Sequence, residues 1–156
     1  MNETPVKAPA EARRRGLLLI WGAQLFSLAL LFGLTYVVWP ESSRDGNHTF
    51  AWALGAIGFT SFLVSFLIKR KLLAKAAAER RLDLGTSAYI VAFAMCEMTA
   101  LLGFVAYLVT GLSYALHSFI IAAAGMFLHF PSRGALEAIE SGGATATGVG
   151  FNKTTL

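Results

Sequence analysis

The side chain best placed for chemistry in this sequence is Glu97, the only acidic residue inside an apolar run. It lies near the middle of residues 86–110, a run long enough to cross a bilayer. A charge at the bilayer centre costs about 2.5–3.5 kcal/mol on insertion scales, so an acid there is by default a functional-site hypothesis. Without a cation at that depth the neutral acid is favoured. We therefore expect a neutral, hydrogen-bonded Glu97.

Three roles for Glu97 stay open at this point. Glu97 forms a structural hydrogen bond between helices, binds a proton or ion reversibly, or contacts a cofactor or lipid. Counting residues inward from each membrane face, at 1.5 Å per residue, places four polar side chains within about 5 Å of its depth. These candidate hydrogen-bond partners are Gln24, Ser27, Thr60 and Ser61.

Small side chains recur along the same run at helical spacing and form a stripe beside Glu97. A stripe of this kind lets the backbone of a neighbouring helix approach closely in lipid. We interpret it as a packing surface, most simply between the second and third apolar runs. Its residues are Ala92, Cys96, Thr99, Gly103 and Ala106.

Other chemistry is sparse. Cys96 is the single cysteine, which excludes an internal disulfide and a cysteine-rich zinc cluster. His117 and His129 lie in or at the edge of an apolar run, but they are 12 residues apart and so fall near opposite membrane faces. We predict no metal, and no haem or chlorophyll held by either histidine. No phosphate loop, zinc-protease motif, nucleophile elbow or carboxylate pair occurs, and we expect no enzyme.

Composition sets the class of protein. The 156 residues are 56% hydrophobic and 14% charged, with a mean hydropathy of +0.61. A soluble domain is less apolar and more charged than this. The sequence therefore predicts an all-α integral membrane protein with four transmembrane helices in an antiparallel bundle. The expected spans are residues 16–39, 50–68, 86–110 and 112–130.

The segments outside these spans set the orientation. Residues 1–15 are expected to be a tail, residues 69–83 a helical loop, and residues 131–156 a mostly disordered tail with a short helix over 133–139. Of the 13 basic residues, 12 fall on one side of the spans. The excess of Lys and Arg on one side predicts cytoplasmic termini, in a bacterial-type inner (plasma) membrane.

The net charge of +4 and the pI near 9.5 do not indicate nucleic acid, because the basic residues flank apolar runs instead of forming a separate stripe. Lipid headgroups are the simpler partner. We expect the chain to contact the bilayer and other membrane subunits or copies of itself, with no soluble substrate.

Residues 51–109 resemble the hairpin of the rotary ATP synthase proteolipid, subunit c. The resemblance consists of a helix with small residues, a polar loop and a second helix with a carboxylate near its middle. The residues that fit the family's phrase are Glu97, Ala100, Leu101, Gly103, Phe104 and Val105. The resemblance implies that Glu97 binds a transported proton or sodium ion.

Two functions follow. The first is a non-catalytic accessory or structural subunit of a larger, energy-transducing membrane complex, with Glu97 as a buried hydrogen bond. The alternative is a proteolipid like subunit c that forms a homo-oligomer and binds a proton or ion at Glu97. The two spans outside the resembling hairpin, which do not repeat it, favour the first function.

Overall fold

The computed structural model describes residues 9–38 and 47–141, and this part of the chain contains helices and no strand. Three helices are long and apolar enough to cross a membrane. They are α1 (Pro9–Val37), α2 (His48–Glu79) and α3 (Leu82–Thr110). A shorter apolar helix, Ser113–Leu128, consists of the 3-10 turn η1 (Ser113–Leu116) and α4 (His117–Leu128), and α5 (Arg133–Ser141) follows it. The all-helical class predicted from the sequence is confirmed.

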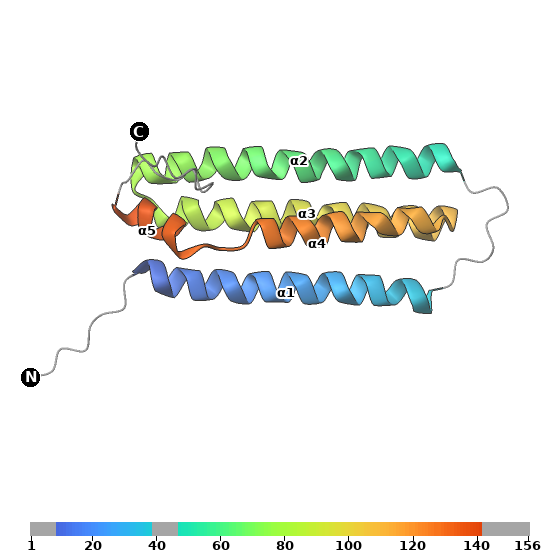
Figure 1. Cartoon of the computed structure of the whole chain (residues 1–156), viewed down its shortest axis with the longest axis horizontal. Coiled ribbons are helices and arrows are strands. Elements are labelled where there is room, and N and C mark those ends of the chain that lie inside the picture. Colours follow the sequence, from blue (N-terminus) through green and yellow to red (C-terminus); the bar gives the residue numbers. More distant parts are fainter. Residues whose placement is uncertain (1–8, 39–46, 142–156) are drawn as a thin grey trace, which may run out of the picture.

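Helix α3 is the centre of the molecule. In Figure 1, α1 and α2 lie on either side of α3 and α4, and α5 lies at the end where α1 begins. In its most apolar stretch α3 is 44% buried, against 17% for α2 and 11% for α1. The outer faces of α1 and α2 therefore expose apolar side chains, as helices in hydrocarbon do.

The tightest unit is the hairpin of α2 and α3. Helix α2 is followed by Arg80, which adopts a left-handed conformation (φ 52°, ψ 39°) and turns the chain. The amide of Arg81 then donates to the carbonyl of Ala76 at 2.9 Å. Because residues 69–79 are rich in Ala, Leu and Lys, which favour helix, α2 continues past the apolar run 50–68 into the segment expected to be helical. Likewise α3 starts at Leu82, ahead of the expected residue 86.

The first helix also starts earlier than expected. Residues 9–15 were expected to belong to a tail, but α1 begins at Pro9. Proline suits the first turn of a helix, where its missing N–H has no partner to lose. An ion pair between Glu11 and Arg15, at 3.1 Å, then links successive turns. Residues 1–8 lie outside the described part of the chain.

The C-terminal half departs from a single helix over 112–130. Gly111 is left-handed (φ 67°) and Leu112 is extended, so the chain re-enters helix only through η1. Helix α4 stops at Leu128, shortly before Pro131, because a proline disfavours helix in the residue that precedes it. Helix α5 is somewhat longer than the helix expected over 133–139. The expected disorder beyond residue 141 concerns residues outside the described part.

Helix α5 closes what we call the basic end of the molecule, formed by the start of α1, the turn between α2 and α3, and α5 itself. Its Leu136 and Ile139 are buried in the largest apolar cluster, together with Leu17 and Tyr89. The side chain of Arg133 lies 3.6 Å from Glu11 of α1. The last helix thereby joins the two ends of the chain described here.

Candidate functional site

Glu97 forms one hydrogen bond between two helices. The hydroxyl of Ser27 on α1 donates to Oε1 of Glu97 on α3 at 2.8 Å. Glu97 is half-buried, and within the described residues its Oε2 has no hydrogen bond. The carboxyl group therefore couples α1 to α3 with one oxygen and leaves the other for the surroundings.

The three other candidate partners of Glu97 lie elsewhere. Thr60 donates to the carbonyl of Ala56 in its own helix at 2.8 Å, and Ser61 donates to the thioether of Met98 at 3.9 Å. Gln24 is half-buried on α1 and, among the described residues, has no hydrogen bond to Glu97. Counting residues from the membrane faces predicted a similar depth for all four side chains. Because the side chains point in different directions, Ser27 is the one among them that bonds to Glu97.

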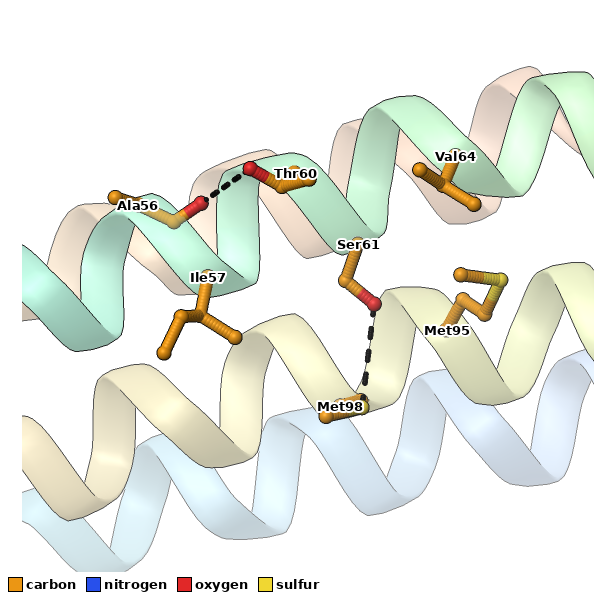
Figure 2. Close-up of a pocket in the computed structure, with 7 residues that line it drawn as sticks. All are labelled: Ala56, Ile57, Thr60, Ser61, Val64, Met95 and Met98. Atoms are coloured by element: carbon orange, nitrogen blue, oxygen red, sulfur yellow. Dashed lines mark hydrogen bonds between the residues drawn. The ribbon is translucent and has the colours of Figure 1, made fainter.

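Thr60 and Ser61 instead line an open groove between α2 and α3 (Figure 2). The groove has a volume of about 400 Å³, and Met95 and Met98 form its α3 side. Figure 2 shows Ser61 pointing across the groove toward Met98, while Thr60 bonds back to Ala56. A thioether is a weak acceptor, so Ser61 keeps most of its hydrogen-bonding capacity.

The small-residue stripe of α3 is buried against both neighbouring helices. Ala92, Cys96 and Thr99 are at most 1% exposed, and Thr99 donates to the carbonyl of Gly58 on α2 at 2.9 Å. A methyl group added at Gly103 would lie 2.9 Å from the carbonyl of Ala115 in η1 and closer still to Ser118 of α4. Ala106, the last residue of the stripe, is 2% exposed. The stripe thus packs against α2 at Thr99 and against η1 and α4 at Gly103.

A second polar pair lies deeper in the protein. Ser65 of α2 and His129, the residue that follows α4, are fully buried, and their Oγ and Nε2 atoms are 2.8 Å apart. The hydroxyl of Ser65 also donates to the carbonyl of Phe62 at 2.6 Å. A serine hydroxyl has one proton, so His129 must supply the proton of the other bond from Nε2. A charged imidazolium would also place an unpaired N–H at the buried Nδ1, so we assign His129 as the neutral tautomer that is protonated on Nε2.

This assignment leaves Nδ1 of His129 as a buried acceptor with no hydrogen-bond partner among the described residues. The imidazole packs on the ring of Phe66 with centroids 4.3 Å apart, and the buried thiol of Cys96 lies beside Ser65. An enclosed histidine of this kind acts first as a link between helices. From its sequence position His129 was weighed only as a ligand, because nothing in its spacing points to Ser65.

His117, the other histidine weighed as a ligand, is exposed, and its Nδ1 lies 2.8 Å from the carbonyl of Tyr114 in the preceding 3-10 turn. The two histidines thus sit at opposite ends of α4. Within the described ranges, no group of three or more His, Cys, Asp or Glu side chains gathers around a common point.

The described side chains offer one acid with a free oxygen, one buried serine–histidine pair and a groove with two hydroxyl groups. This arrangement can join helices and can hold a proton or a small cation at Glu97. Comparison of the chain with family models, with curated proteins and with solved structures finds no match.

Proposed function

We propose that the chain is a non-catalytic, structural subunit of a larger membrane assembly. The observation that carries this proposal is the hydrogen bond from Ser27 to Glu97 at 2.8 Å. It uses the costly mid-span acid as a link between α1 and α3, the role expected of a neutral carboxylic acid in hydrocarbon. Elsewhere along α1, Trp21 donates to the carbonyl of Met126 at 2.9 Å and Leu28 is buried in an apolar cluster.

The groove between α2 and α3 supports the assembly part of the proposal. Ser61 and Thr60 place hydroxyl groups on an otherwise apolar outer face. Lipid tails offer no hydrogen bonds, whereas a neighbouring transmembrane helix offers both close packing and acceptors. The groove is therefore a suitable seat for a helix of another subunit.

The same proposal includes four membrane crossings with both termini on the basic side, in a bacterial-type inner membrane. Helix Ser113–Leu128 is about 26 Å long, slightly less than the roughly 30 Å hydrocarbon core. It packs along α3, and Tyr114 near its start is a residue type that is common at a membrane interface.

Cysteine accessibility tests this topology. In a Cys96→Ala background, single cysteines at the exposed positions Ser113 and Ser132 are treated with a membrane-impermeant maleimide in sealed vesicles. We expect Ser132→Cys to react only from the cytoplasmic side and Ser113→Cys only from the other side. Reaction of both from one side would mean three crossings and a re-entrant fourth run.

Purification from native membranes in mild detergent tests the proposed function. Affinity-tagged chain should co-purify with other polypeptides at fixed stoichiometry, and Glu97→Gln should assemble normally because an amide oxygen still accepts from Ser27. Glu79→Gln, at an exposed position near the turn, is the matched control. Recovery of a ring of identical copies alone would overturn the accessory role.

The alternative is an ion-binding proteolipid like subunit c, and the unbonded Oε2 of Glu97 is the observation that favours it. A hydrophobic carbodiimide tests it, because the reagent modifies a protonated carboxyl group in the bilayer. In an exchanging site Glu97 reacts, and sodium or alkaline pH slows the reaction. Absence of modification, with normal assembly of Glu97→Gln, would exclude the transport function.

A further inference from the structure

Lys69 is a partly buried cation at the basic end that lacks a carboxylate partner among the described residues. Its ammonium group lies 4.3 Å from the ring centroid of Tyr89, which is 1% exposed. Other basic residues there do have acidic partners: Lys75 lies 3.8 Å from Glu79, and Arg81 lies 2.7 Å from Asp83. Lys69 therefore differs from its neighbours in being both enclosed and uncompensated.

Among the described side chains, the groups around the ammonium supply no negative charge. The nearby His129 is the neutral tautomer assigned above, and Cys96 is a buried free thiol. Ser132 lies at the hydroxyl of Tyr89 and adds only a neutral dipole. The attraction of a cation to an aromatic ring is weaker than the cost of burying an unpaired ion.

The position of Lys69 in the chain specifies the kind of anion. It is the first residue after the apolar run 50–68, so its ammonium lies at the boundary between hydrocarbon and lipid headgroups. Arg70 and Lys71 follow it, are exposed and have no ion pair among the described residues. Phe66 and Phe62 lie one and two turns before it on the same face of α2 and are partly exposed.

We propose that Lys69 binds the phosphate of an anionic phospholipid, with Arg70 and Lys71 adding attraction and with an acyl chain lying along Phe66 and Phe62. An ammonium has three donors, and phosphate oxygens are strong, charged acceptors. The attached acyl chain distinguishes this ligand from free phosphate, because the aromatic face of α2 leads from the phosphate level into the hydrocarbon.

Native mass spectrometry of the delipidated protein tests the site, with phosphatidylglycerol, phosphatidylcholine or inorganic phosphate added back. We expect phosphatidylglycerol adducts on the wild type and a loss of about tenfold in Lys69→Gln, the effect of one charge-assisted bond. Arg70→Gln removes the same charge from the neighbouring exposed position and should change binding less than about threefold. Equal losses in both variants would overturn a specific site.

Phosphatidylcholine and inorganic phosphate show whether Lys69 binds an anionic lipid, any phospholipid or free phosphate. Retention of phosphatidylcholine as strong as that of phosphatidylglycerol would overturn recognition of net negative charge. Displacement of phosphatidylglycerol by inorganic phosphate at equal concentration would contradict the assignment of the ligand as a phospholipid and would indicate a site for free phosphate.

A measurement on the wild-type chain guards against a Lys69→Gln variant that fails to fold. An amine-reactive reagent modifies lysines in nanodiscs, and peptide mass spectrometry reports each position. Phosphatidylglycerol, compared with phosphatidylcholine, should slow modification of Lys69 several-fold more than that of the exposed Lys71. Equal protection of both lysines would contradict the proposal.

Discussion

Two serines each bind a titratable side chain on another helix, but in different surroundings. Ser65 and His129 are fully buried, with the ring of Phe66 against the imidazole. Ser27 and Glu97 are half-buried, and one carboxyl oxygen stays without a partner among the described residues. The enclosed pair can serve only the fold of this chain, whereas the half-buried pair is open to ions, lipid or another subunit.

The difference also affects energetics. A buried polar group left without a partner costs about 1–3 kcal/mol, while hydrogen bonds between membrane helices average about 0.6 kcal/mol. We therefore expect the Ser65–His129 pair to dominate stability and the Ser27–Glu97 pair to dominate interactions. Four variants measure how far this division holds, beginning with the largest expected effect.

Truncation of the enclosed histidine should have the largest effect. His129→Ala removes the ring that packs on Phe66 and leaves a cavity between α2 and α4, so we expect a loss of about 2–4 kcal/mol in the free energy of unfolding. Denaturant titration in mixed micelles measures it. His117→Ala, at the exposed end of α4, should stay within about 0.5 kcal/mol of the wild type. Equal effects of the two variants would refute the special position of His129.

Removal of the hydroxyl of Ser65 should come second. Ser65→Ala leaves the Nε2–H of His129 buried without an acceptor, at a cost of about 1–3 kcal/mol. In a double-mutant cycle with His129→Leu, the combined loss should be smaller than the sum of the single losses, because the second change removes the unpaired donor. Strict additivity would mean that the 2.8 Å contact contributes nothing.

Loss of the half-buried Ser27–Glu97 hydrogen bond should lower the free energy of unfolding less than loss of the Ser65–His129 contact. Ser27→Ala removes the donor to Glu97, and we expect a loss of about 0.6 kcal/mol in the free energy of unfolding. Glu97 then has no hydrogen bond among the described residues, so its reaction with carbodiimide should become faster. A larger loss for Ser27→Ala than for Ser65→Ala would reverse the comparison and make the mid-span acid the main stabilising contact.

The groove residue should respond least. Thr60→Val removes a hydroxyl that bonds only within its own helix, so the isolated chain should change by less than about 0.5 kcal/mol. Recovery of co-purifying subunits should fall if the groove seats a partner helix. Val64→Ala is the control, because it changes a side chain of the same groove without removing a hydrogen-bonding group. Unchanged recovery with both variants would exclude the groove as the interface.

Several features follow from the sequence alone. In hydrocarbon every backbone N–H and C=O must be hydrogen-bonded within the protein, and a helix achieves this within one continuous apolar run. The same runs locate Glu97 as the one acid within them, and the spacing of small residues marks the face of α3 that is buried. The helical character expected for residues 69–83 is seen in α2 up to Glu79, but the start of α1 was less well predicted, because residues 9–15 extend it beyond the apolar boundary.

The tertiary structure decided which polar groups meet. Counting along the apolar runs predicts a similar depth for Ser27, Thr60 and Ser61. Only Ser27 points toward Glu97, because the rotation of a helix about its axis is set by packing against its neighbours. Ser65 and His129 are 64 residues apart in the sequence, and they meet only because α2 and α4 pack together. Sequence periodicity records which face of one helix is apolar, whereas a contact depends on the positions of two helices at once.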